Sequence, residues 1–304
     1  MATHGTALSG RGTPREPDEI VRVPVSGHEV AAYSYGSGDN VLFLVNGGPG
    51  RASLPMRNEH AYLADHGWRV VSHDQLGTGA SDRPEDPALW TVARYAEEVE
   101  TVRKALGLGP VHLLGRSWGG WLGCEYVTTY PNSVKSFIAS NTCADMPFHM
   151  IELRRLISAF GAATVDMVDR HEAEGTLDDP EYKAFCTLFY CRHQDRRPTG
   201  PRPPDVEGEL NFGIQLGLWG PAEFSCVGDL RDWSRLEELR SFDKPCLVFN
   251  GVHDYLTVKE GALIHQAVRG SEMVVFANSG HRPADDEPQA YYDMLEGFLA
   301  RHRN

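Results

Sequence analysis

A serine lies at the centre of the segment Gly115-Arg116-Ser117-Trp118-Gly119-Gly120, which has the pattern G-x-S-x-G. An apolar run (111–114) precedes it and a helix-like segment (121–126) follows it, so the pattern predicts a strand, a sharp turn and a helix with the serine at the apex. Small neighbours are needed because strand and helix approach closely at such a turn. The turn exposes the hydroxyl for nucleophilic attack and points the N–H of Trp118 at the oxygen of the attacked carbonyl.

A carboxylate and an imidazole that could activate this serine follow later in the chain. Asp254 comes just after the apolar run 246–250, and His281 comes just after the run 272–276. Reacting groups in parallel sheets gather at the C-terminal ends of the strands, and the chain order Ser…Asp…His is the one found with this turn. A serine hydroxyl needs a histidine to take its proton and a carboxylate to orient that histidine. The sequence therefore predicts a triad of Ser117, Asp254 and His281.

A glycine-rich loop, Asn46-Gly47-Gly48-Pro49-Gly50, follows another apolar run at 41–45. Consecutive glycines leave backbone N–H groups open to a substrate oxygen. Together with the N–H of Trp118 they would form an oxyanion hole worth about 3–4 kcal/mol per donor. We find no metal-ligand spacing, phosphate-binding loop or dinucleotide-binding fingerprint, so we expect no metal and no cofactor.

Composition narrows the possible partners and location. The formal charge of −13, from 29 basic and 42 acidic residues, argues against nucleic acid and anionic membranes. No apolar stretch approaches the roughly 18 residues of a membrane helix. Residues 1–19 lack the apolar segment of a secretion signal and predict a flexible tail. The six cysteines have no C-x-x-C spacing, and we expect them to be reduced in a cytoplasmic protein. The sequence carries no signal for an oligomeric state.

The order of elements predicts an α/β fold with one insertion. Strand-like and helix-like segments alternate over 20–145 and again over 239–304, which indicates a mostly parallel central sheet with helices on both faces. The first two strand-like runs are expected to form an entry hairpin. The rhythm stops between 146 and 238, where helical segments at 151–160 and 181–189 predict a helical cap inserted after the sixth strand. A loop rich in proline, glycine and arginine is expected at 196–204.

Three blocks of the sequence together resemble one family. Residues 46–50, 74–84 and 115–120 are similar to the H-G-G-P-G, D-Q-x-G-x-G-x-S and G-x-S-W-G-G blocks of the proline iminopeptidase-like α/β-hydrolases. The resemblance runs from about residue 20 to the C-terminus. It implies the α/β-hydrolase fold and removal of one N-terminal amino acid from a peptide or amide through an acyl-enzyme. It also implies that Gly48 and Trp118 donate to the oxyanion and that Gly47 contacts the substrate.

The cap segment Trp219-Gly220-Pro221-Ala222-Glu223-Phe224 resembles the G-P-x-E-F segment of the same family. By this resemblance Glu223 binds the free α-amino group of the substrate, and Asp229 is a second candidate. A carboxylate there would also reject N-acylated substrates, because it would lose its partner. Two positions depart from the family: Asn46 replaces a histidine, and Tyr255 stands where several members have a second amine-binding glutamate. The second departure predicts altered substrate selection.

The expected activity is thus that of a serine aminopeptidase or aminoacyl-amide hydrolase. Its partner would be a small peptide or aminoacyl amide with a free amino group. Relatives that remove aminoacyl groups from natural-product intermediates make such an intermediate another possible substrate. A carboxylesterase or lactonase using the same triad, without amine recognition, is an alternative. A non-catalytic binding protein with the α/β-hydrolase fold is a third.

Overall fold

The computed structural model describes residues 8–196 and 210–303. At the centre of its sheet lies β3 (Asn40–Val45), in which every residue is buried. Side chains of a strand point alternately to its two faces. Accordingly, Val41, Phe43 and Val45 pack into one hydrophobic cluster, whereas Leu42 and Leu44 pack into another on the opposite face. Both faces are covered, and for this reason residues 41–45 of the strand are all apolar, without alternation.

Eight strands form one sheet in the order β1-β2-β4-β3-β5-β6-β7-β8. The first two, β1 (Glu19–Val25) and β2 (His28–Tyr35), pair antiparallel as the expected hairpin, and β2 pairs antiparallel with β4. The remaining neighbours are parallel. The other strands are β4 (Trp68–His73), β5 (Val111–Arg116), β6 (Val134–Ser140), β7 (Cys246–Gly251) and β8 (Glu272–Phe276).

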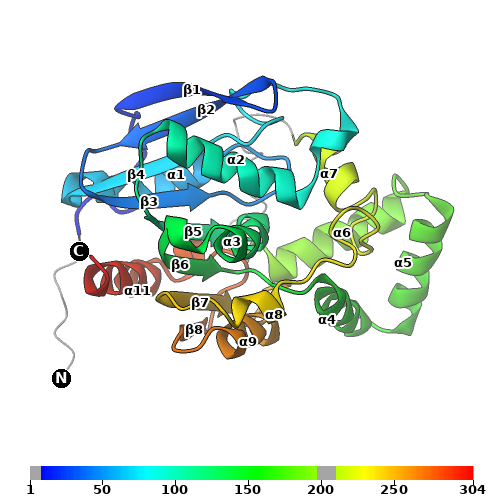
Figure 1. Cartoon of the computed structure of the whole chain (residues 1–304). Helices are drawn as coiled ribbons and strands as arrows, with labels where there is room; N and C mark the ends of the chain where they lie inside the picture. The colour runs from blue at the N-terminus through cyan, green and yellow to red at the C-terminus, as the bar shows by residue number, and fades with distance from the viewer. Residues whose placement is uncertain (1–7, 197–209, 304) are drawn as a thin grey trace.

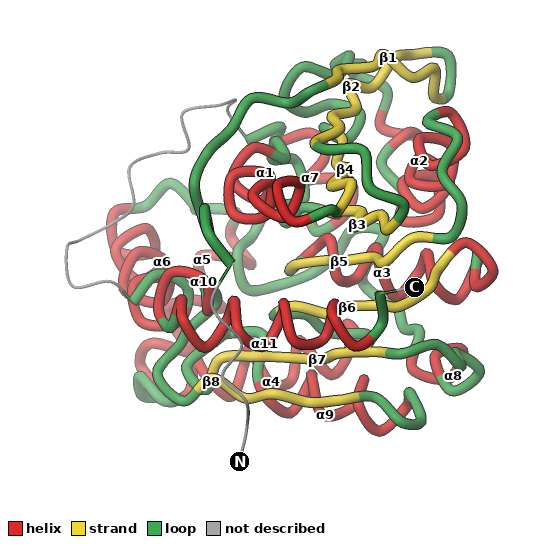
Figure 2. Tube along the Cα trace, turned by 90° about the vertical axis from the view of Figure 1, so that its left-hand side faces the viewer, coloured by secondary structure: helices red, strands yellow, loops and turns green. Residues whose placement is uncertain are grey.

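Helices cover both faces of the sheet, as the sequence predicted (Figures 1 and 2). On one face lie α2 (Val92–Ala105), α3 (Trp118–Thr129) and α9 (Val258–Ala267), whose apolar side chains join the first cluster. On the other face lie α1 (Leu54–His60) and α11 (Pro288–Arg301), which join the second. The architecture is that of an α/β-hydrolase. In the described part of the chain, no helix is both long and apolar enough to cross a membrane.

Between β6 and β7 the described residues form helices and no strand. Helices of this segment gather at one end of the sheet in Figure 1. The helix α5 (Ala162–Glu174) was not predicted from the sequence, because its two buried residues, Val168 and His171, make too narrow an apolar stripe to show a helical period. Most of the loop expected at 196–204 lies outside the described residues. The helices of this segment are α4 (Met146–Ser158), α5 (Ala162–Glu174), α6 (Pro180–His193), α7 (Phe212–Leu218) and α8 (Leu236–Leu239).

The N-terminal segment differs from the flexible tail that composition predicts, as far as it is described. Arg11 forms ion pairs with Glu296, at 2.6 Å, and with Asp293, at 2.7 Å, both on α11. Its guanidinium also lies 5.5 Å from the ring of Tyr292. These contacts hold Arg11 against the helix that ends the chain. A local composition cannot reveal partners that lie almost 300 positions away.

Candidate active site

Ser117 occupies a sharp turn between β5 and α3 and has φ 57° and ψ −126°. This backbone conformation is strained for a residue with a side chain and is the one expected at the apex of a G-x-S-x-G turn. The glycines on either side permit it. A Cβ added to Gly115 would lie 2.2 Å from the carbonyl oxygen of Gly119, and one added to Gly119 would lie 2.0 Å from that of Val45. The sequence prediction of strand, turn and helix therefore matches the structure.

Asp254 and His281 meet because their strands are neighbours. The ends of β7 and β8 pair in register, and the N–H of His253 donates to the carbonyl of Ser279, which joins the two following loops. Nδ1 of His281 lies 2.9 Å from Oδ1 of Asp254. Both residues are buried, so the carboxylate keeps the ring proton on Nδ1 and leaves Nε2 as an acceptor.

Asn141, which sequence reasoning missed, supports the aspartate from the end of β6. Its side-chain amide donates to Oδ2 of Asp254 at 2.7 Å, while the N–H of Leu256 donates to Oδ1 at 3.0 Å. Both carboxylate oxygens are therefore held, which fixes the orientation of the group that in turn orients His281. A polar residue directly after a buried strand is the signal that could have revealed Asn141.

Tyr255 stands between the serine and the histidine. Its hydroxyl lies 3.4 Å from Nε2 of His281 and also hydrogen-bonds the side chain of Ser117. Its ring packs against the imidazole with the centroids 4.7 Å apart. Burial, reinforced by the nearby Asp254 carboxylate, raises the pKa of Tyr255, so the phenol stays protonated. Among the described residues, this hydroxyl rather than the serine is the hydrogen-bond partner of Nε2.

The expected oxyanion donors lie beside the serine. A Cβ added to Gly47 would be 3.2 Å from Cβ of Ser117, and Gly48 has φ 152°, a conformation that favours glycine. Trp118 is the first residue of α3, where backbone N–H groups have no partner within the helix. The carbonyl of Ser117 accepts instead from Gly120 and Trp121, at 2.8 and 3.2 Å. The N–H of Trp118 lies at the start of α3, directly after Ser117, and has no partner within the helix.

The second sequence block, which begins at Asp74, positions the loops around the site. The carboxylate of Asp74 accepts hydrogen bonds from the N–H and hydroxyl of Ser53, at 2.8 and 2.7 Å, and from the hydroxyl of Tyr33 at 2.8 Å. The side chain of Gln75 accepts from the indole of Trp118 at 2.9 Å. Asp74 therefore binds the segment after the glycine loop, and the neighbouring Gln75 binds the first residue of α3.

The two candidate carboxylates of the inserted helical segment have different surroundings. Glu223 is partly buried, and Oε2 accepts a short hydrogen bond from the hydroxyl of Tyr190. Asp229 is exposed and accepts from the N–H of Val92 at 2.9 Å, at the first residue of α2. Asp229 therefore caps a helix and lines neither of the cavities described next, whereas Glu223 lines one of them.

Two cavities meet beside the serine. The cap cavity, of about 300 Å³, is bounded by Glu223 and by aromatic side chains that include Trp121, Trp219 and Phe224. The serine cavity, of about 280 Å³, contains Ser117 and His281. Residues that line both cavities are Gly48, Arg51, Gln194 and Tyr255. A molecule with its carbonyl at Ser117 can therefore extend into both.

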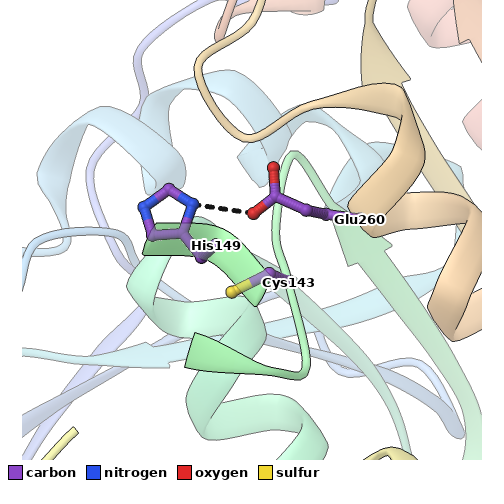
Figure 3. A group of neighbouring side chains, drawn as sticks. All are labelled: Cys143, His149 and Glu260. Carbon is purple, nitrogen blue, oxygen red and sulfur yellow. Dashed lines mark hydrogen bonds and ion pairs between the residues drawn. The ribbon is translucent and has the colours of Figure 1, made fainter. Parts of the chain in front are cut away.

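Cys143, His149 and Glu260 form a buried group at the edge of the cap cavity (Figure 3). Nδ1 of His149 lies 2.7 Å from Oε1 of Glu260, whose other oxygen accepts from the N–H of Thr257. Burial raises the pKa of the Cys143 thiol well above its usual value, so the thiol stays protonated. The His149–Glu260 hydrogen bond braces this part of the cavity wall.

Comparison with known proteins gives concordant results. The α/β hydrolase fold family matches residues 40–175. A proline iminopeptidase of Heyndrickxia coagulans is 31% identical, over 91% of this chain and 97% of its own. The crystal structure of proline iminopeptidase from Mycobacterium smegmatis superposes with a TM-score of 0.82 at 29% identity, covering 93% of this chain and 98% of that one. The crystal structure of VinJ superposes with a TM-score of 0.82 at 28% identity, covering 94% and 99%.

Proposed function

This chain belongs to the proline iminopeptidase family of α/β hydrolases, and we propose that it removes an N-terminal aminoacyl group from a small amide or peptide. The observation that carries the proposal is the convergence of Ser117, Asp254 and His281 beside a cavity with one partly buried carboxylate, Glu223. The first three supply the chemistry of acyl transfer. The carboxylate supplies a reason to select substrates with a free amino group.

The reaction begins when Ser117 attacks the carbonyl carbon of the aminoacyl group. The substrate displaces the Tyr255 hydroxyl from between serine and histidine, and Nε2 of His281 takes the serine proton. Asp254 stabilises the imidazolium that forms. The oxyanion accepts hydrogen bonds from the N–H groups of Gly48 and Trp118.

Collapse of the tetrahedral intermediate breaks the C–N bond, and the imidazolium of His281 gives its proton to the departing amine. The aminoacyl ester on Ser117 is then attacked by water, with His281 again as the base. The free amino acid leaves and the serine hydroxyl is restored. Gly47 lies beside the serine and leaves room for the substrate at this point.

Recognition of the amine falls to Glu223 in the cap cavity. The hydroxyl of Tyr190 holds one carboxylate oxygen and leaves the other to receive the substrate ammonium. Such a charge-assisted hydrogen bond contributes about 1.5–3 kcal/mol. Asp229 is left out of this proposed site because it caps α2.

Two further expectations remain part of the proposal. The core would comprise residues 20–145 and 239–304, with the cap at 146–238, since the helices α4 to α8 fall between β6 and β7. A cytoplasmic location is supported by the six cysteines, all of which are free.

The decisive experiment compares aminoacyl p-nitroanilides with their N-acetyl derivatives. We expect kcat/KM to be at least about thirtyfold higher for the free amines, because acetylation removes the charge that Glu223 binds. Glu223→Gln should reduce this preference about tenfold or more, while Glu181→Gln, an exposed glutamate on α6, leaves it unchanged. Ser117→Ala should abolish turnover.

Equal cleavage of the acetylated substrates would exclude amine recognition. Faster hydrolysis of p-nitrophenyl acyl esters would then support the carboxylesterase or lactonase alternative. If Ser117→Ala turned over substrate at the wild-type rate, Ser117 would not be the nucleophile, and both the aminoacyl hydrolase and the esterase hypotheses would be excluded.

A further inference from the structure

The serine cavity lies on the side of the site that must receive the leaving group. His281, which lines this cavity, hands its proton to the departing amine, so that amine lies within hydrogen-bond reach of Nε2. The aminoacyl part extends the other way, into the cap cavity that holds Glu223. The two cavities therefore divide the substrate at its scissile bond.

Three arginines line the serine cavity, namely Arg51, Arg116 and Arg282. Arg51 follows the glycine loop and is exposed, Arg116 precedes the serine, and Arg282 follows the histidine. They come from three separate parts of the chain: Arg116 and Arg282 are next to Ser117 and His281, and Arg51 lies three positions after Gly48. All three side chains line the cavity on the leaving-group side of Ser117.

Two of these guanidinium groups are held in place from behind. Nη1 of Arg116 lies 2.5 Å from Glu59, while Arg282 lies 3.2 Å from Asp285 and 3.9 Å from Glu59. Their side chains are only 12% and 14% exposed. A guanidinium has five N–H donors, and these contacts use only part of them. A guanidinium with donors to spare can bind a planar, two-oxygen acceptor such as a carboxylate.

The two cavities differ in their charged side chains. Glu223 lines only the cap cavity, Arg116, Arg282 and Asp195 line only the serine cavity, and Arg51 lines both. A short peptide has a matching arrangement, with an ammonium at one end and a carboxylate about 7 Å away when two residues are extended. An uncharged amine leaving group would form no ion pair with the guanidinium groups of the serine cavity.

We propose that the serine cavity is a subsite for a carboxylate on the leaving group, so that short peptides with a free C-terminal carboxylate are preferred substrates. This inference rests on the proposed aminoacyl hydrolase function and adds the class of leaving group. The carboxylate accepts hydrogen bonds from Arg282 and Arg116, with Arg51 at the exposed side.

The test uses the wild-type enzyme and matched dipeptides. With X as the aminoacyl group cleaved best from p-nitroanilides, X–Gly and X–Gly amide differ only in the terminal charge. We expect kcat/KM to be about tenfold higher for X–Gly, the ratio that one net charge-assisted hydrogen bond produces. The expected difference lies mainly in KM, because the carboxylate is bound before and during reaction.

Two variants locate the effect. Arg282→Gln and Arg51→Gln should each move the ratio of X–Gly to X–Gly amide toward one, and the Arg51 variant keeps the test available if Arg282→Gln fails to fold. Arg301→Gln, which alters an exposed arginine paired with Glu272, should leave the ratio as in the wild type.

Equal kcat/KM for the acid and the amide would overturn the subsite while leaving the proposed function intact, because both dipeptides are still cleaved. A preference that survives both cavity variants would overturn the assignment to these arginines. Failure to cleave any free-amine p-nitroanilide would instead count against the proposed function itself.

Discussion

Asp254→Asn is the substitution whose consequence the hydrogen bonds define most closely. Oδ1 of Asp254 accepts from Nδ1 of His281 at 2.9 Å and from the N–H of Leu256 at 3.0 Å, and Oδ2 accepts from the amide of Asn141 at 2.7 Å. Three donors thus converge on two acceptor oxygens. An asparagine side chain has one acceptor oxygen and one NH₂ donor. At least one of the three donors must then face another donor.

Either orientation of the new amide impairs the base. If its oxygen faces His281, its NH₂ faces that of Asn141, and the imidazolium formed during catalysis has no carboxylate beside it. If its NH₂ faces His281, the bond from Leu256 is lost and Nδ1 becomes an acceptor. The ring proton then sits on Nε2, which can no longer take the proton of Ser117.

We expect kcat to fall about 10³- to 10⁴-fold, equivalent to about 4–5.5 kcal/mol of transition-state stabilisation. The KM for aminoacyl p-nitroanilides should change less than about threefold, because Asp254 does not line the cap cavity in which we propose that the amine binds. One buried donor left without an acceptor costs about 1–3 kcal/mol of unfolding free energy.

Steady-state kinetics and urea unfolding of the same preparations measure these quantities. Asp243→Asn, an exposed carboxylate just before β7, is the matched control and should leave kcat and stability unchanged. A variant at position 254 that is as stable as the wild type and keeps more than a tenth of its kcat would refute the argument that this carboxylate orients the base.

Three further predictions concern the serine turn, the tyrosine and a buried histidine. Tyr255→Phe removes a hydroxyl that competes with Ser117 for Nε2 of His281. The rate at which a fluorophosphonate labels the serine should therefore be retained or rise up to about fivefold. A hundredfold loss of that rate would show that the hydroxyl is needed for proton transfer. Gly119→Ala places a methyl group 2.0 Å from a backbone oxygen and should cost more than about 3 kcal/mol in urea unfolding, whereas Gly109→Ala, with no neighbour within 4 Å, should change stability by less than about 0.5 kcal/mol. Burial lowers the pKa of His112 from 6.5 to about 4. Between these values the unfolded chain binds a proton that the folded chain does not, so this contribution to stability is complete above pH 6.5 and lost as the pH falls toward 4. His112→Gln should flatten that part of the curve of unfolding free energy against pH, and an unchanged slope would contradict the assignment.

The elements that position the site were readable from local sequence. An apolar run buried on both faces, a glycine turn and a following helix are each short-range features, because strand, turn and helix preferences act over a few residues. The order of Ser117, Asp254 and His281 could then be read from the ends of three such runs. These three ends lie at one edge of the sheet because the strands that carry them are parallel.

Other features depend on partners distant in the chain. Glu223 and Asp229 are both acidic residues of one segment, and only packing separates them: one lines a cavity beside Tyr190, and the other caps α2. The support of Asp254 by Asn141 joins positions 113 residues apart.

The sequence by itself determined the fold class, the family and the chemical groups of the proposed site, since these follow from local patterns and short motifs. Tertiary structure alone decided that Tyr255 lies between Ser117 and His281, that Arg282 and Arg116 share Glu59 behind a cavity, and that Arg11 holds the N-terminal segment on α11. The reason is physical: a side chain's direction and partners are set by close packing among elements that the sequence separates, and no local preference encodes that geometry.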